Sequence, residues 1–303
     1  MRILYLGLPL GALHLARRGH VLAAVAVGHP ESPGMRRLRR RIAPRGVPVL
    51  GRPDLNDPQV RHCLRTAAPD AVLSFFWPRK VPEAVRTMGR LGAFGVHPSL
   101  LPRWRGPDPY FWALRAGDAV TGVTLHRLAS EYDTGELVAR RRLPIAPDDD
   151  AWRLARRLDR PALELLAECA DRLAAGEHLP GEPQDEAAAT DAPEPTERDL
   201  AIDWTRSAED IVRLVRAAAP WPGARARFDE AVVTVLRAEV LPEPPPRALR
   251  PGEAWRTPHG LAVCTGRGAV VVHRVRTDGG EERSGADLLP AHPVPGAGPP
   301  QAG

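Results

Sequence analysis

The 303-residue chain lacks several features whose absence excludes whole classes of protein. It has three cysteines, Cys63, Cys169 and Cys264, which are far apart and form no Cys-x-x-Cys pair. We therefore expect neither a disulfide framework nor a zinc site, and no metal. The sequence has no run of about 18 apolar residues, and its first residues do not have the layout of a secretory signal. We expect a cytoplasmic protein without a membrane segment.

Two common phosphate-binding loops are also missing. The first apolar run leads into GLPLG, which is not G-x-G-x-x-G, and no G-x-x-x-x-G-K-[ST] occurs anywhere. These loops supply the backbone cradle for a dinucleotide or a nucleoside triphosphate, so both of those functions are disfavoured. An open α/β sheet can still bind a ligand beyond the carboxyl ends of its strands.

Lysine is almost absent, since Lys80 is the only one, and arginine supplies nearly all of the positive charge. The formal net charge of +5 permits a polyanionic partner such as nucleic acid, although arginine richness also reflects a GC-rich genome. Six arginines crowd one expected loop or short helix: Arg36, Arg37, Arg39, Arg40, Arg41 and Arg45. This cluster is either a solvated face or a surface that contacts phosphates.

The first half of the chain alternates short apolar runs with helical segments. Strands are expected at residues 1–7, 21–27, 47–50, 71–76 and 93–97. Helices are expected at 12–18 and 82–88, and a further helix begins at residue 58 with Asp57 as its N-cap. Strands separated by helices form βαβ units, and these build a parallel sheet. We therefore predict a Rossmann-like, doubly wound α/β domain.

The second half predicts a different architecture. Strands at 120–128 and 136–143 precede a helix capped by Asp150, which Pro161 should kink or split. A proline-rich and acidic stretch follows, then a helix opened by Ser207 and short strands at 231–241, 261–264 and 269–275. We predict a domain at 1–178, a linker at 179–198, a small OB-like β-barrel at 199–292 and a flexible tail at 293–303.

The stretch between Gly95 and Gly135 holds the residues best suited to chemistry. His97 ends an expected strand, and Asp133 lies in a later turn. A histidine and a carboxylate that meet in space can manage a proton, although His97 could instead be structural. Asp133-Thr134-Gly135 also matches the Asp-Thr-Gly of aspartic proteases, but a single copy cannot form their pair of carboxylates.

Three motifs in this stretch resemble the folate-dependent formyltransferases: HPSLLPRWRG at 97–106, AGDAVTGVT at 116–124 and DTGEL at 133–137. Further along, IDW at 202–204 and RAAAPWPG at 216–223 are similar to the C-terminal domain of the methionyl-tRNA formyltransferases. The resemblance covers nearly the whole chain. It implies transfer of a formyl group from 10-formyltetrahydrofolate to an amine, with the amino group of initiator methionyl-tRNA as the expected acceptor, by a monomer.

The resemblance also implies roles for individual residues. His97 matches the catalytic histidine of the family and Asp133 its catalytic aspartate. The segment associated with folate matches Ser99, Leu100, Leu101 and Pro102, and the loop that flanks the pterin includes Phe76, Trp77 and Val81. Contacts with tRNA are expected from Arg36, Arg37, Arg40, Arg41, Arg103 and Arg105.

One residue departs from the family pattern. The family has Asn-x-His, in which the asparagine amide donates to the formyl oxygen, whereas this chain has Gly95 two residues before His97. Loss of one oxyanion donor costs on the order of 10² to 10³ in turnover. Two alternatives therefore stand beside the tRNA enzyme: a formyltransferase for an amino sugar or another metabolite amine, and a catalytically weakened protein that binds nucleic acid.

Overall fold

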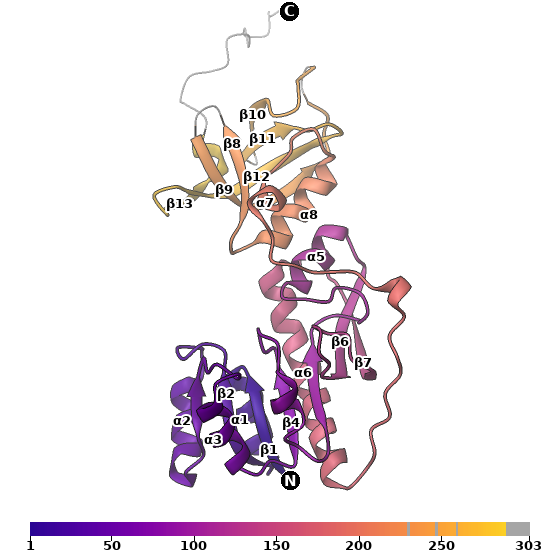
Figure 1. The fold of residues 1–303 in the computed structure, drawn as a ribbon. Coiled ribbons are helices and arrows are strands. Elements are labelled where there is room, and N and C mark those ends of the chain that lie inside the picture. The colour runs from indigo at the N-terminus through magenta and orange to yellow at the C-terminus, as the bar shows by residue number, and fades with distance from the viewer. Residues whose placement is uncertain (229–230, 246–247, 259, 289–303) are drawn as a thin grey trace, which may run out of the picture. The chain divides into compact units, whose positions relative to one another are not determined.

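A computed structural model describes residues 1–228, 231–245, 248–258 and 260–288 of the chain (Figure 1). The contacts between residues divide the chain into two compact units. The first unit holds residues 1–110, 119–145 and 154–194, and the second holds 111–118, 146–153 and the described residues from 195 onward. The tail expected at 293–303 lies outside the described residues.

The first unit is built on a seven-stranded sheet with the order β3-β2-β1-β4-β5-β6-β7. Its strands are β1 (Arg2–Gly7), β2 (Val21–Val27), β3 (Val49–Gly51), β4 (Ala71–Phe75), β5 (Ala93–His97), β6 (Val120–Arg127) and β7 (Leu137–Pro144). The strands β1 to β5 run parallel to one another. Strand β6 is antiparallel to β5, and β7 is antiparallel to β6. This order of the parallel strands is that of a doubly wound sheet, so the predicted α/β core is confirmed.

Helices follow the parallel strands of this unit. They are α1 (Pro9–Arg17), α2 (Met35–Ile42), α3 (Pro58–Thr66) and α4 (Glu83–Arg86), with a short 3-10 turn η1 (Ala43–Arg45) after α2. Asp57 caps α3 as expected, because its carboxylate accepts from the backbone N–H groups of Gln59 and Val60. Helices on a parallel sheet bury its strands, which explains why β1, β2 and β4 are almost continuously apolar.

Five of the six arginines of the cluster lie on the helix α2, and Arg45 ends η1. The buried residues of α2 are Met35, Leu38 and Ile42, whose spacing puts them on one side of the helix. Arg36, Arg37, Arg39, Arg40 and Arg41 are exposed. Helix α2 is therefore an amphipathic helix that is held by three apolar side chains and covered with positive charge.

Helix α6 (Ala151–Ala174) continues through Pro161 without interruption. The expected N-cap is confirmed, since Asp150 accepts from the backbone N–H of Arg153 at 2.8 Å. A split at Pro161 does not occur. Proline removes one hydrogen bond of the helix, but Leu158, Ala162 and Leu165 are fully buried on either side of it and hold the helix together.

The register of β5 and β6 decides which side chains share a face of the sheet. Gly95 is paired directly with His126, and His97 with Thr124. Partners in an antiparallel pair, and residues two apart on a strand, point to the same face. Gly95, His97, Thr124 and His126 therefore lie together on one face at the carboxyl end of β5.

Most of the segment for which the sequence predicts a linker, residues 179–198, belongs to the first unit, which includes it up to residue 194. Glu182 exchanges two backbone hydrogen bonds with Leu137, at 2.8 and 2.9 Å. The backbone N–H of Arg105 donates to the carbonyl of Thr190 at 2.8 Å, and its backbone carbonyl accepts from the N–H of Ala192 at 2.6 Å. The short 3-10 turn η2 (Glu186–Ala188) lies between these two contacts.

The second unit contains helices and an antiparallel sheet. Its helices are most of α5 (Pro109–Ala116), α7 (Glu197–Leu200), α8 (Ala208–Ala218) and the 3-10 turn η3 (Gly285–Leu288). Its strands are β8 (Ala224–Phe228), β9 (Ala231–Leu241), β10 (Ala254–Thr257), β11 (Gly260–Cys264), β12 (Ala269–Thr277) and β13 (Glu282–Ser284). Ser207 caps α8 by accepting from the N–H of Asp210, as expected.

The sheet of the second unit has the order β10-β11-β12-β9-β8, and β13 pairs with β12. Over the described residues the two ends of this path, β10 and β8, do not pair with each other. The antiparallel sheet is thus confirmed, and the closed barrel expected from the sequence is not. Helix α8 packs on β8, β9 and β12 through an apolar face that includes Ile211, Leu214 and Val215.

Candidate active site

His97 lies buried at the carboxyl end of β5, where both of its ring nitrogens face an oxygen atom. Nε2 is 2.8 Å from the carbonyl oxygen of Trp104, and Nδ1 is 3.3 Å from Oδ2 of Asp133. The structure therefore brings together the histidine and the carboxylate that the sequence singles out. Because a carbonyl and a carboxylate only accept hydrogen bonds, a doubly protonated His97 satisfies both contacts.

Asp133 is held in place by several contacts and not only by His97. Its Oδ2 also accepts from the backbone N–H of Gly106 at 3.0 Å, and its Oδ1 lies 3.5 Å from Nε2 of His126. Asp133 has φ of 55°, in the left-handed region that costs a non-glycine residue free energy. Such backbone strain is often found at functional sites, where the surrounding contacts maintain it.

Gln184 fixes the backbone of the turn that carries Asp133. Its side-chain amide donates to the carbonyl oxygens of Asp133, at 2.6 Å, and of Gly135, at 2.7 Å. Its amide oxygen accepts from the guanidinium of Arg105 at 2.8 and 3.1 Å. Gln184 was not a sequence candidate, because nothing in the proline-rich segment around it indicates that it reaches a turn 51 residues earlier.

The loop after His97 is tied down by hydroxyl groups. Ser99 donates to the carbonyl oxygen of Arg103 at 2.7 Å, and Thr124 donates to that of Ser99 at 2.7 Å. The hydroxyl of Thr124 in turn accepts from the N–H of Leu101 at 3.1 Å. Ser99 and Leu101 are fully buried, whereas Leu100 and Pro102 are half-buried. The expected folate segment is thus a rigid loop that presents only part of its length to solvent.

The residues expected beside the pterin follow the strand β4. Phe76 has φ of 53° and stacks on Phe75, with ring centroids 4.2 Å apart. Trp77 packs on the first apolar core, and its indole N–H is buried without a hydrogen-bond partner in the described residues. Val81 is a member of that core and is 8% exposed. Phe76 and Trp77 keep part of their surface accessible, but Val81 contributes mainly to packing.

Gly95 has no side chain, and the neighbouring strand fills the space beside it. A Cβ atom at this position would stand 2.8 Å from Cδ2 of Leu128 and 3.1 Å from Nε2 of His126. The imidazole of His126 thus occupies the volume next to the position where the family carries an asparagine. His126 is a candidate that the sequence reasoning missed, since only the pairing of β5 with β6 brings it to Gly95.

The environment of His126 determines its protonation. Nδ1 lies 2.9 Å from the carbonyl oxygen of Arg127, so this nitrogen carries a proton. Burial lowers the pKa of His126, against the opposing effect of the Asp133 carboxylate. The ring is therefore neutral near pH 7, and its Nε2 presents a lone pair toward Asp133 and Gly95.

Two of the arginines expected to contact tRNA are engaged within the first unit. Arg105 is 9% exposed, and its guanidinium binds both carboxylate oxygens of Glu186 at 2.8 Å as well as Gln184. The hydrogen bond to Glu186 raises the pKa of Arg105. Arg105 is therefore engaged within the first unit and leaves little surface for the expected contact with tRNA. Arg103 stacks its guanidinium over the Trp104 ring at 4.1 Å.

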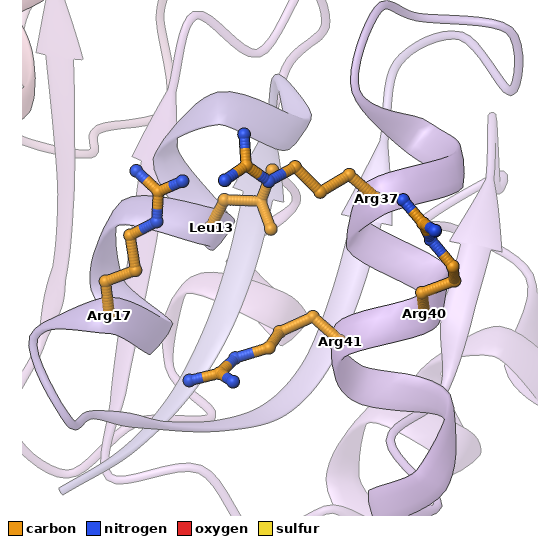
Figure 2. Close-up of a pocket in the computed structure, with 5 residues that line it drawn as sticks. All are labelled: Leu13, Arg17, Arg37, Arg40 and Arg41. Carbon is orange, nitrogen blue, oxygen red and sulfur yellow. The ribbon is translucent and has the colours of Figure 1, made fainter.

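The arginines of α2 border an open pocket of about 510 Å³ between α1 and α2. Figure 2 shows Arg37 and Arg41 reaching from α2 toward α1, where Leu13 and Arg17 lie. Arg40 also lines this pocket. Like charges four residues apart on a helix repel each other, so Arg37 and Arg41 would be stabilised by an anion bound between the helices.

The described ranges contain no group of three histidine, cysteine or carboxylate residues arranged to hold a metal ion. In the same ranges, no helix is both long enough and apolar enough to cross a membrane.

Comparison with known proteins agrees with the geometry of this site. Residues 24–169 match the formyl transferase family, and residues 196–293 match the formyl transferase C-terminal domain. A methionyl-tRNA formyltransferase of Anaeromyxobacter dehalogenans is 38% identical over 95% of this chain and 96% of its own length. One from Methylococcus capsulatus is 35% identical over 98% of both chains.

A solved structure extends the comparison to the fold. HypX from Aquifex aeolicus, in complex with tetrahydrofolic acid, superposes with a TM-score of 0.67 over 95% of this chain and 47% of its own. It is 22% identical in sequence, so the likeness concerns the fold. On the domain matches and on the identity to relatives over almost the full length, this chain belongs to the formyl transferase family.

Proposed function

We propose that this protein transfers the formyl group of 10-formyltetrahydrofolate to the amino group of methionyl-tRNA. The single observation that carries the proposal is the buried contact between His97 and Asp133 at the carboxyl end of β5. The names of the relatives that match over the whole chain support the choice of acceptor. We also propose that the protein acts in the cytoplasm as a monomer.

In the proposed reaction the acceptor amine attacks the formyl carbon. A new C–N bond forms as the amine loses a proton, and the carbonyl electrons move to the formyl oxygen. These electrons return as the bond from the formyl carbon to N10 of the folate breaks, and N10 takes up a proton. His97 would stabilise the oxyanion by donating a hydrogen bond from its ring, and Asp133, 3.3 Å from Nδ1, would keep the ring oriented. Because the Trp104 carbonyl engages Nε2 of His97, binding of substrates must release that nitrogen if it is to reach the oxyanion.

For the folate we propose the loop Ser99, Leu100, Leu101 and Pro102 together with Phe76, Trp77 and Val81. The hydroxyl network around Thr124 gives this loop one conformation, which lowers the entropic cost of binding. The accessible ring surfaces of Phe76 and Trp77 could stack on the pterin, and Val81 would support them from the core.

For tRNA we propose the exposed face of α2, with Arg36, Arg37, Arg40 and Arg41. Each arginine that neutralises a phosphate releases counterions, so binding should weaken steeply with salt. Arg103 could add a contact from the loop after His97. We further propose that the antiparallel sheet of the second unit is an OB-like domain that helps to hold the tRNA.

The direct test is a formyl-transfer assay with purified protein, 10-formyltetrahydrofolate and methionyl-tRNA, beside an active formyltransferase as positive control. We expect transfer by the native protein, and a loss of roughly 10² to 10⁴ in kcat for His97→Ala. His62→Ala, at an exposed position of α3, is the matched control and should keep its activity. No transfer by the native protein, with the positive control active, would refute the proposed acceptor.

A further inference from the structure

The polar atom closest to the empty side-chain position of Gly95 belongs to His126. A Cβ at 95 would stand 3.1 Å from Nε2 and 3.5 Å from Cε1 of this ring. Gly95 and His126 are direct partners in the β5–β6 pair, and His126 is 3% exposed. The polar group next to this position of β5 therefore comes from β6.

The hydrogen bonds of His126 leave one nitrogen ready to receive a proton. The Arg127 carbonyl, 2.9 Å from Nδ1, can only accept, so it fixes the tautomer with the proton on Nδ1. In the neutral ring Nε2 then carries a lone pair. The side chain as a whole is 3% exposed, so this lone pair faces mainly protein atoms.

The nearest charged atom to this lone pair is also an acceptor. Oδ1 of Asp133 lies 3.5 Å from Nε2 of His126, whereas Oδ2 is already engaged by Gly106 and His97 at 3.0 and 3.3 Å. Two acceptors this close are both satisfied when an amine lies beside them and donates one N–H to each. An attacking amine supplies both N–H groups.

On these observations, and on the proposed function, we infer that His126 is a further catalytic residue, whose Nε2 accepts the proton of the attacking amine beside Gly95. As the amine nitrogen bonds to the formyl carbon, its proton passes to Nε2 and the carbonyl electrons remain on the formyl oxygen. When the bond to N10 breaks, N10 takes the proton from His126. The ring is then neutral again, and no electron acceptor is needed.

The surroundings of His126 suit both stages of this cycle. Burial favours the neutral ring before the reaction, so the base is available. Asp133 Oδ1 stabilises the cation that forms during the reaction. The protonated ring also places an Nε2–H donor next to Gly95, where it can contribute to stabilising the oxyanion in the absence of a side chain at that position.

The test is the kcat of His126→Ala at saturating methionyl-tRNA and 10-formyltetrahydrofolate, with and without added imidazoles of different basicity. We expect a loss of roughly 10² or more in kcat, a KM for each substrate within about threefold of native, and partial rescue that rises with the basicity of the added imidazole. A purely structural histidine would not produce that dependence on basicity. His62→Ala is again the matched control.

Two results would overturn the inference: a kcat for His126→Ala within about threefold of native, or a loss that added bases restore equally whatever their basicity. If His126→Ala does not fold, His126→Gln retains most of the volume without a basic nitrogen. A native melting temperature with kcat lowered roughly 100-fold then supports the inference, and a native kcat refutes it. Lack of activity in the native protein would instead be a failure of the proposed acceptor, so the two failures are distinguishable.

Discussion

Gln184 donates a hydrogen bond of 2.6 Å to the backbone carbonyl of Asp133 and thereby joins a proline-rich segment to the turn that carries the carboxylate. The same amide donates to Gly135, and its oxygen accepts from Arg105. One side chain thus orients the turn and holds a buried guanidinium.

Gln184→Ala should lower both stability and turnover. It leaves two carbonyl groups and part of a buried guanidinium unsatisfied, which costs about 1–3 kcal/mol in the free energy of unfolding. Because Asp133 has a strained backbone, loss of this support should also reduce kcat more than it raises either KM. Chemical denaturation and steady-state kinetics measure the two effects. Gln59→Ala, on an exposed face of α3, is the control, and equal behaviour of the two variants would contradict this role.

Gly95→Ala should disturb the position of His126. The added methyl would lie 2.8 Å from Leu128 Cδ2 and 3.1 Å from His126 Nε2, so both side chains have to move. Overpacking of this kind typically costs about 1–3 kcal/mol in the free energy of unfolding. We expect a lower melting temperature and a lower kcat.

The control for this substitution is Gly279→Ala, because a Cβ there would meet only the Thr277 hydroxyl oxygen, at 3.8 Å. The same crowding predicts that Gly95→Asn alone will not raise activity, whereas Gly95→Asn combined with His126→Ala will be more active than His126→Ala. If Gly95→Asn alone were strongly activating, His126 would not be the group that compensates for the glycine.

Arg37→Glu combined with Arg41→Glu should weaken tRNA binding without affecting folate binding. Both side chains reach into the space between α1 and α2, and neither is part of the site around His97 (Figure 2). We expect a higher KM for methionyl-tRNA and an unchanged KM for 10-formyltetrahydrofolate. The slope of log affinity plotted against log salt concentration should decrease in magnitude by about 0.7–0.9 for each phosphate that the variant no longer neutralises.

The control for the arginines is Arg160→Glu, which reverses one exposed charge on α6. A salt dependence that is the same for the native protein and the double variant would exclude α2 from the tRNA surface. Loss of folate binding in the double variant would show that the substitutions act on the fold.

The pH dependence of stability should carry a contribution from His126. Burial lowers its pKa in the folded protein below the ordinary 6.5, so between these two values the unfolded chain binds more protons than the folded one. The contribution of His126 to stability is therefore fully present above its pKa in the unfolded chain. It is lost as the pH falls through its pKa in the folded protein. His126→Gln should lose less stability than the native protein between about pH 7.5 and 5.5, as measured by urea denaturation. Parallel curves would contradict a buried neutral histidine.

Much of the fold could be predicted from local pattern. The alternation of apolar runs with helical segments predicted the parallel core, and Asp57, Asp150 and Ser207 were predicted as helix caps because a cap depends only on its own neighbours. The closed barrel could not be predicted securely, because strand closure depends on pairing between residues that are distant in sequence.

The candidate site divides in the same way. His97 and Asp133 could be recognised from residue types and spacing within one stretch of sequence, and Gly95 from the resemblance to the formyltransferases. His126 and Gln184 could not, because neither lies in a motif. Arg105 was expected to contact tRNA, and only the packing of residues 184–186 against it makes it a buried partner of Glu186.

By itself, the sequence determined the family, the parallel core and the pair of residues best suited to proton transfer, since these follow from composition, periodicity and short motifs. Only the tertiary structure decided what stands beside Gly95. The register of β5 against β6 places the His126 imidazole in that space, the Arg127 carbonyl fixes which nitrogen carries its proton, and burial lowers its pKa. These relationships arise from strand pairing and burial, which bring together residues that no local pattern connects.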